Sequence, residues 1–193
     1  MKNHIESIKK TAGFTLIELL VVIGILGILA AALVATIDPF EQIKKANDSK
    51  IKNMAVEFQT ANVRYFTTHN AFPWTEEAAD APEACTDLGA ADIVGASLSD
   101  LSSCLGNSST GYTLIGEGEL KSAFTTNTND LEDVLVFWDT DDANNLKVCF
   151  SPTSKSQKSA PDANILCETG LVDTGDTCPS ATAADGTCCW CTQ

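Results

Sequence analysis

Hydrophobic residues fill the chain almost without interruption from residue 14 to residue 37. These 24 residues contain one charged side chain, that of Glu18. At a rise of 1.5 Å per residue, a helix of this length spans roughly 36 Å, which is enough to cross the hydrocarbon core of a bilayer. The pattern therefore predicts a transmembrane helix over residues 14–37.

A second hydrophobic pattern follows Asp38 and Pro39, where apolar residues recur at a spacing close to 3.6 residues. They are Ile43, Ile51, Met54, Phe58, Ala61 and Tyr65. This period predicts an amphipathic helix over about residues 40–68 that buries its apolar side against a domain. Because proline bends a continuing helix, we expect residues 14–69 to form one long kinked helix.

Three short runs beyond this helix are rich in β-branched and aromatic residues and are bounded by turn formers. They cover residues 112–115, 133–138 and 146–150. Such runs predict strands. The last two flank a polar hairpin loop at residues 139–145, and residues 151–160 are typical of a loop. We predict an α+β fold in which a small antiparallel sheet packs on the amphipathic helix.

These patterns divide the chain into four segments. Residues 1–13 form a leader, residues 14–37 the apolar helix, residues 38–69 the amphipathic helix, and residues 70–193 a globular head. The head has 20 acidic residues and four lysines. Removal of the leader takes away three lysines and one glutamate, and 9 basic and 25 acidic side chains are left, a formal net charge of −16. Such an acidic surface disfavours direct binding of nucleic acid.

All eight cysteines follow the apolar helix. They are Cys85, Cys104, Cys149, Cys167, Cys178, Cys188, Cys189 and Cys191. An even number outside the cytoplasm predicts a disulfide framework. Proximity along the chain favours the pairs Cys85–Cys104 and Cys149–Cys167, and Cys178 then joins one of the last three. Zinc binding by the Cys-Cys-Trp-Cys cluster is disfavoured, because the spacing lacks the usual two-residue gap.

Glu18 lies only four residues inside the apolar stretch. An ionised carboxylate there costs on the order of 2.5 kcal/mol or more unless a partner neutralises it. Proteolysis between Gly13 and Phe14 would create an α-amine on Phe14 at almost the same depth. This amine can pair with Glu18 of its own chain or of a neighbouring copy, which would make the charge an assembly signal. Alternatively, Glu18 reaches the membrane interface as part of an ordinary anchor.

The leader carries Lys2, Lys9 and Lys10 against Glu6, and a basic flank of this kind stays on the cytoplasmic side of the membrane. The head is then exported. An ordinary secretory signal would instead be cleaved after the apolar run, where small residues lie at positions 30–32 and 35. That site is the alternative to cleavage after Gly13.

The leader ending in Gly13, the sequence Phe14-Thr15-Leu16-Ile17-Glu18 and the apolar helix with Gly24 and Gly27 resemble the type IV prepilin and type II secretion pseudopilin superfamily. The likeness covers residues 9 to about 73 and is only architectural beyond them. It implies cleavage after Gly13 by a membrane prepilin peptidase, N-methylation of Phe14 and a role for Glu18 in filament assembly.

The resemblance implies a structural subunit of a type IV pilus-like filament that serves adhesion, motility or DNA uptake. Its partners would be further copies in a helical filament and the assembly machinery. It would lie in the cytoplasmic membrane before assembly, then in a surface pilus or the periplasm. One alternative is a pseudopilin of a type II secretion system, and another is an anchored binding domain that never polymerises. Eight cysteines depart from the single C-terminal disulfide loop common among type IVa pilins.

The remaining chemistry in the sequence is sparse. Asp139, Asp141 and Asp142 offer oxygen ligands for calcium, but the EF-hand register lacks its glycine and its final glutamate, so a solvated hairpin turn is favoured. After removal of the leader, His69 is the one histidine, and no nucleophile motif or phosphate-binding loop occurs. We therefore expect no enzyme activity and no cofactor.

Overall fold

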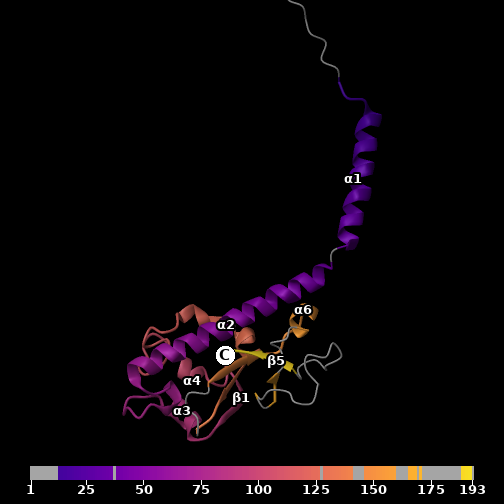
Figure 1. Ribbon diagram of the computed structural model, residues 1–193. Coiled ribbons are helices and arrows are strands. Elements are labelled where there is room, and N and C mark those ends of the chain that lie inside the picture. The colour runs from indigo at the N-terminus through magenta and orange to yellow at the C-terminus, as the bar shows by residue number, and fades with distance from the viewer. Residues whose placement is uncertain are drawn as a thin grey trace, which may run out of the picture. The chain divides into compact units, whose positions relative to one another are not determined.

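The computed structural model describes residues 13–36, 38–126, 128–140, 146–159, 165–168, 170 and 188–192. The chain forms two compact units, Met1–Pro39 and Phe40–Gln193. The first unit contains helix α1 (Leu16–Thr36), and the second contains a five-stranded sheet with helices around it (Figure 1). The predicted α+β fold is confirmed.

Helix α1 is apolar on every side, because Glu18 is the one charged residue among its 21. The stretch Leu16–Val34 is long and apolar enough to cross a membrane, and none of it is buried. Its large side chains are exposed, for example Ile28 at 73%. A helix with this all-round apolar surface is stable where lipid or other apolar helices surround it.

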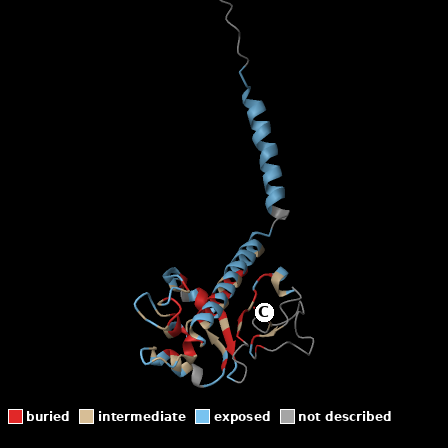
Figure 2. Cartoon of the chain, turned by 60° about the vertical axis from the view of Figure 1, so that its left-hand side comes forward, coloured by how far each residue is buried: buried red, intermediate tan, exposed pale blue. Residues whose placement is uncertain are grey.

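Helix α2 (Pro39–His69) is the longest element of the second unit. Pro39 suits its first turn, because a backbone N–H at that position has no partner within a helix. The helix ends at His69, and the next residue, Asn70, has a φ of 55° in the left-handed region. The N–H of Asn70 donates to the carbonyl of Phe66 over 2.8 Å. One face is buried, as Figure 2 shows, and consists of Asp48, Ile51, Ala55, Phe58, Ala61, Asn62 and Tyr65.

Ile43 departs from the predicted apolar face of this helix. Its side chain is 66% exposed, whereas Met54 is partly buried against the core. Ile43 precedes the first buried apolar residue, Ile51, by two turns. The period identifies the apolar face but not how far along the helix the head covers it, and the expected burial of Ile43 is wrong.

The sheet has the strand order β1-β2-β3-β5-β4, with antiparallel neighbours throughout. The strands are β1 (Ile93–Ser97), β2 (Val134–Trp138), β3 (Lys147–Phe150), β4 (Ile165–Leu166) and β5 (Cys188–Cys191). Val134 in β2 lies opposite Phe150 in β3, so the strands predicted at residues 133–138 and 146–150 are confirmed as a pair. The sequence reading missed β1, β4 and β5.

The strand predicted at residues 112–115 is wrong. Tyr112 has a φ of 55°, and turns and a bend, with no strand residue, occupy the run. The N–H groups of Leu114 and Ile115 donate to the carbonyls of Cys104 and Leu105 over 3.1 and 3.0 Å. Both apolar side chains are buried. A short apolar run therefore fills the core here from an irregular segment, which periodicity cannot distinguish from a strand.

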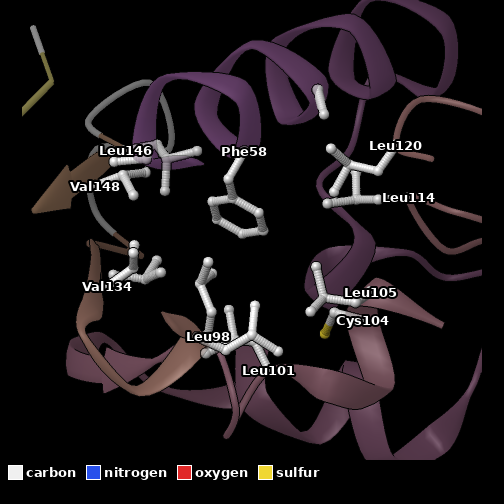
Figure 3. Packing of buried hydrophobic residues seen from close by; sticks show 14 of the residues in the cluster. Phe58, Leu98, Leu101, Cys104, Leu105, Leu114, Leu120, Val134, Leu146 and Val148 are labelled. Atoms are coloured by element: carbon white, nitrogen blue, oxygen red, sulfur yellow. The ribbon is translucent and has the colours of Figure 1, made fainter. Parts of the chain in front are cut away.

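The core lies between α2 and the sheet. Phe58 of α2 is fully buried, and in Figure 3 its ring points into a cluster of aliphatic side chains from several segments. These are Leu98, Leu101, Leu105, Leu114, Leu120, Val134, Leu146 and Val148. The packing buries the apolar faces of helix and sheet together, which is the arrangement expected from the sequence.

Short helical segments connect these elements. A 3-10 turn, η1 (Pro73–Thr75), follows α2 and buries Trp74, whose ring stacks on Phe72 at 5.1 Å between centroids. The others are α3 (Glu83–Thr86), η2 (Asp87–Ala90), α4 (Ser102–Leu105), η3 (Ser122–Thr126), α5 (Thr128–Glu132) and α6 (Lys155–Lys158). Helix α6 falls within the segment that the sequence analysis assigned to a loop.

Hydrogen bonds to Asp48 hold the start of α6 against the first half of α2. Its carboxylate is 2% exposed and accepts four hydrogen bonds. The backbone N–H and hydroxyl of Thr153 donate over 2.9 and 2.8 Å, and those of Ser154 over 2.8 and 2.5 Å. Burial by itself would raise the pKa of Asp48, but the hydrogen bonds from Ser154 and Thr153 bring this pKa below its ordinary value.

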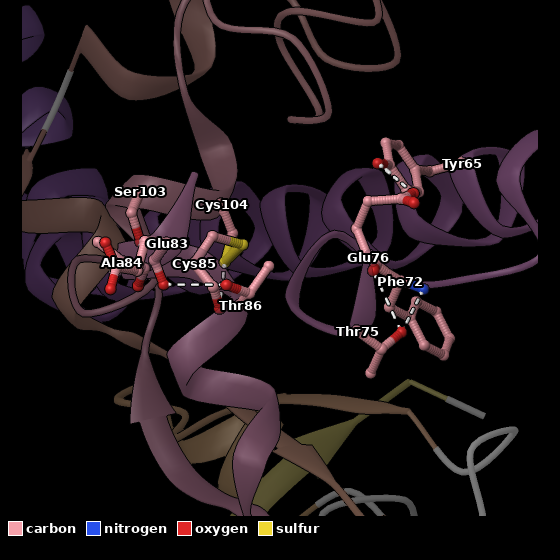
Figure 4. The surroundings of a disulfide bond; sticks show 10 residues. All are labelled: Tyr65, Phe72, Thr75, Glu76, Glu83, Ala84, Cys85, Thr86, Ser103 and Cys104. Atoms are coloured by element: carbon pink, nitrogen blue, oxygen red, sulfur yellow. Dashed lines mark hydrogen bonds between the residues drawn. A yellow bond between two sulfur atoms is a disulfide. The ribbon is translucent and has the colours of Figure 1, made fainter. Parts of the chain in front are cut away.

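A disulfide between Cys85 in α3 and Cys104 in α4 confirms one predicted pair (Figure 4). Nearby, the hydroxyl of Ser103 donates to the carbonyl of Ala84 over 3.0 Å, so two contacts join these short helices. Because α3 and α4 each have only one turn, the covalent bond contributes much of what keeps them together.

The predicted pair Cys149–Cys167 is wrong. Cys149 is bonded to Cys191, and Cys167 is bonded to Cys189. Cys149 and Cys191 lie directly opposite each other in the neighbouring strands β3 and β5. Strand pairing, rather than distance along the chain, therefore selects the partner. Cys188 is disulfide-bonded as well, and the expectation that Cys178 joins one of the last three cysteines lies outside the described residues.

Candidate functional site

The candidate site is the start of α1, where Thr15 and Glu18 form a capping box. The backbone N–H and the hydroxyl of Thr15 both donate to Oε2 of Glu18 over 2.8 Å. In return, the N–H of Glu18 donates to the Thr15 hydroxyl over 3.3 Å. A threonine before the first helical residue and a glutamate three positions later satisfy two N–H groups that the helix leaves open.

This geometry adds a hydrogen-bonding partner to the one considered from the sequence, which was the Phe14 amine that proteolysis would create, in the same chain or in a neighbouring copy. Within the isolated chain, Thr15 already binds the carboxylate. The negative charge also lies in the first turn of α1, where the helix dipole favours it. The spacing Thr15-x-x-Glu18 is the signal from which the sequence analysis could have identified Thr15.

Gly13 and Phe14 precede the capping box as irregular, exposed backbone. Phe14 is 90% exposed, and apart from the two neighbouring residues no atom lies within 4 Å of the position that a Cβ on Gly13 would occupy. The peptide bond between them is therefore accessible in the described part of the chain. Phe14 and Glu18 also share one side of the helix start, a shallow hollow that they line together with Ile17, Val21 and Val22.

The calcium candidate lies mostly outside the described residues, which include Asp139 but neither Asp141 nor Asp142. Asp139 is exposed. Its neighbour Thr140 donates through its N–H and hydroxyl to Asp92 over 2.9 and 2.7 Å, which lowers the pKa of that carboxyl group. Among the described residues, no group of three or more histidine, cysteine, aspartate or glutamate side chains is placed to hold a metal ion.

His69 has a structural environment at the end of α2. Its ring stacks on Tyr65 at 4.0 Å between centroids, and its Nδ1 lies 2.9 Å from the hydroxyl of Thr68. The buried Tyr65 hydroxyl donates to Glu76 over 3.2 Å. Burial and the charge of Glu76 raise the pKa of Tyr65, so this tyrosine stays a neutral donor. These contacts hold the C-terminal turn of α2 against the head.

A groove runs along the side of α2 in the second unit. Asp130 is 7% exposed there and forms an ion pair with Lys50. The groove is lined by Lys50, Asn53, Met54, Glu57, Lys121, Ala123, Phe124 and Asp130. Its charges balance, with two lysines facing two carboxylates, and the pair between Lys50 and Asp130 ties α2 to α5.

Comparison with known proteins gives one match, at the N-terminus. Residues 8–34 match a family model described as the prokaryotic N-terminal methylation motif. No curated protein and no solved structure gave a significant match. The matched residues include the leader end, the capping box and nearly all of α1. Over residues 8–34 the chain thus carries the class III signal of type IV pilins and pseudopilins, which lies at the start of a membrane-length helix.

Proposed function

We propose that this protein is the structural subunit of a type IV pilus-like filament, processed after Gly13 and assembled through α1. The observation that carries the proposal is the methylation motif at residues 8–34, which ends within a helix that is apolar on all sides and exposed. A monomeric soluble domain would not keep such a helix uncovered. Lipid surrounds it before assembly, and copies of α1 surround it in the filament.

Processing begins with the chain inserted through α1, its basic leader in the cytoplasm and its acidic head outside. A prepilin peptidase cleaves the accessible bond between Gly13 and Phe14. The new amine of Phe14 is then N-methylated, which keeps its positive charge. Thr15 and Glu18 are untouched by the cleavage, so the capping box still closes the N-terminus of α1 while the subunit is in the bilayer.

Assembly then gives Glu18 a second partner. As the subunit leaves the bilayer, the Phe14 ammonium group of an adjacent subunit pairs with the Glu18 carboxylate and neutralises a charge that the filament core would otherwise bury alone. Only a correctly staggered neighbour presents its amine at that depth. The capping box lowers the free-energy cost of placing the Glu18 carboxylate in lipid before assembly. The ion pair then selects the stagger between neighbouring subunits in the filament.

The head supplies the outer surface of the filament. Its acidic residues keep that surface anionic. Its disulfides join α3 to α4, β3 to β5, and Cys167, just after β4, to β5. Such cross-links suit a domain exposed outside the cell for long periods. This durability favours a surface pilus over the short periplasmic filament of a secretion pseudopilin, and the methylation motif favours a structural role over an enzymatic one.

Mass spectrometry of the N-terminal peptide in material sheared from the cell surface tests the proposal. We expect abundant protein whose first residue is N-methylated Phe14. The same processed peptide confined to membranes would favour a pseudopilin or an anchored domain, and an uncleaved N-terminus would remove the processing step. Gly13→Leu is the matched variant, and it should leave full-length precursor in the membrane.

The variant Glu18→Leu tests the assembly step. We expect it to be inserted and processed normally, while the yield of sheared filaments falls about ten-fold or more because the neighbouring ammonium group loses its carboxylate. Val22→Leu, on the same side of α1, is the control and should assemble normally. Normal filament yield from Glu18→Leu would contradict the pairing.

A further inference from the structure

Four lysines of this acidic protein lie near the start of α2 or in α6. Beyond the leader the chain has nine lysines and arginines. Lys44 and Lys45 lie in the second turn of α2, and Lys155 and Lys158 lie in α6. More than 100 residues separate the two pairs in sequence, and the sequence analysis did not connect them. We call these four lysines the basic collar.

Tertiary contacts bring the two halves of the collar together. Glu41, in the first turn of α2, accepts a hydrogen bond from the N–H of Lys155, and Asp48 binds Thr153 and Ser154 just before α6. Figure 1 shows α6 beside the first half of α2. Residues three or four positions apart lie on one face of a helix, and Lys44 and Lys45 have this spacing both from Glu41 and from Asp48. The two lysines therefore lie on either side of the line from Glu41 to Asp48, along which α6 packs.

Among the described residues from Asp38 to Asp48 and in α6, three exposed lysines outnumber one exposed carboxylate, that of Asp38. Lys44, Lys45 and Lys155 are exposed. The carboxylate of Asp48 is buried by its four hydrogen bonds, and that of Glu41 is bound to the backbone of α6. The head as a whole carries 20 acidic residues and four lysines, and two of these lysines belong to the collar. The collar is thus a local reversal of sign in a strongly acidic domain.

Chain length alone keeps Lys44 near the end of the membrane-length stretch. That stretch ends at Val34, α1 ends at Thr36 and α2 begins at Pro39. With 1.5 Å per helical residue and about 3.5 Å per extended residue, Lys44 lies at most about 21 Å from Val34 in any arrangement of the two units. In the orientation proposed above, Lys44 lies on the exported side of the membrane, whereas the positive-inside bias places lysine and arginine on the cytoplasmic side. Membrane topology therefore does not explain why the collar is basic.

We propose that the basic collar binds the anionic phospholipid headgroups of the membrane while α1 is inserted. Basic side chains beside a membrane helix are attracted to anionic lipid, and the attraction fades within a Debye length of about 8 Å at physiological salt. The collar offsets the repulsion between the acidic head and an anionic surface. This inference rests on the part of the proposed function that places α1 in a bilayer, but it does not require a filament.

Lysine labelling of the full-length protein in nanodiscs tests the collar without any substitution. An amine-reactive reagent is added to protein in discs of phosphatidylglycerol and in discs of phosphatidylcholine, and mass spectrometry gives the rate at each lysine. We expect labelling of Lys44, Lys45 and Lys155 to be about five-fold slower in phosphatidylglycerol, because roughly that factor follows from one lysine near an anionic surface. The exposed Lys121, outside the collar, is the internal control and should label equally in both lipids. High salt should abolish the difference.

Equal rates in the two lipids, or equal slowing at Lys121, would overturn the proposal. The collar lysines could also label more slowly in phosphatidylcholine discs, and only when each disc holds two copies of the protein. That result would overturn the proposal and show that the collar binds the acidic head of a second copy. Filament formation is scored separately in sheared material. If filaments form while the collar lysines label equally in both lipids, this inference fails alone. If the collar is protected but no filaments form, the proposed filament function fails alone.

Discussion

At the scale of single residues, Glu18 illustrates how a short motif resolves an apparent conflict. The carboxylate lies in the most apolar part of the chain, yet Thr15 binds it through one N–H and one hydroxyl. The pair also closes the N-terminus of α1, so the charge has a structural use before any neighbour is present. Both hydrogen bonds from Thr15 go to Oε2, so Oε1 of the same carboxylate is the oxygen that the proposed ammonium partner could bind without displacing Thr15.

Thr15→Val tests the capping box directly. The variant keeps the shape of the side chain but removes the two hydrogen bonds that involve the hydroxyl, and the first turn of α1 should lose about 1 kcal/mol. In micelles, hydrogen exchange at the amides of Glu18 and Leu19, which donate to Thr15, should then become about five-fold faster. Thr15→Ser retains the hydroxyl and should behave like the native chain. Equal exchange in the two variants would contradict the cap.

At the scale of elements, the attachment of α6 to α2 depends on one carboxylate. The pKa of Asp48 is lower in the folded protein than its ordinary value, because the hydrogen bonds from Ser154 and Thr153 outweigh burial. A lowered pKa means that the unfolded state binds the proton more tightly. The stabilisation by Asp48 is therefore complete above about pH 4 and is lost as the pH falls through the folded-state pKa.

Asp48→Asn should lower the free energy of unfolding by about 2 to 4 kcal/mol at pH 7, because the amide places its NH₂ group against donors. The difference from the native chain should shrink below about pH 4, where the native carboxylate also takes up a proton. Denaturant unfolding of the full-length protein in detergent at several pH values measures both effects. Glu57→Gln changes an exposed carboxylate of the same helix and should be nearly neutral. If the decrease in the free energy of unfolding caused by Asp48→Asn did not vary with pH, the negative charge of Asp48 would not be the source of the stabilisation.

At the scale of the whole molecule, β5 occupies an interior position in the sheet although it comes from the C-terminus. It pairs with β3 on one side and β4 on the other, and its cysteines bond to Cys149 and Cys167. Trp190 in the same strand packs on Phe150 and lies under Lys52 of α2. The C-terminal strand is therefore part of the sheet of the head. Its disulfides join segments that are far apart along the chain, which a pairing of neighbouring cysteines in the sequence does not predict.

Two double variants distinguish the observed disulfides from the pairing expected by proximity. Cys149→Ala with Cys191→Ala removes one bond, should leave no free thiol, and should lower the free energy of unfolding by about 2 to 4 kcal/mol. Cys149→Ala with Cys167→Ala breaks two bonds and should leave Cys189 and Cys191 as titratable thiols. Titration of free thiols in the unfolded, unreduced proteins measures both outcomes. Free thiols in the first double variant and none in the second would instead support the pair Cys149–Cys167.

The sequence by itself determined the features that depend on neighbouring residues. The apolar run, the 3.6-residue period of α2 and the pair of strands around residues 139–145 are local patterns, and the methylation motif is a local signal. The extent of the head along α2, the turns at residues 112–115, the position of β5 and the partner of Cys149 were decided only by tertiary structure. In each of these cases, several segments of similar hydrophobicity compete for one place, and the packing of the whole head selects among them. The basic collar has the same origin, because α6 reaches Lys44 and Lys45 through Glu41 and Asp48, across more than 100 residues of chain.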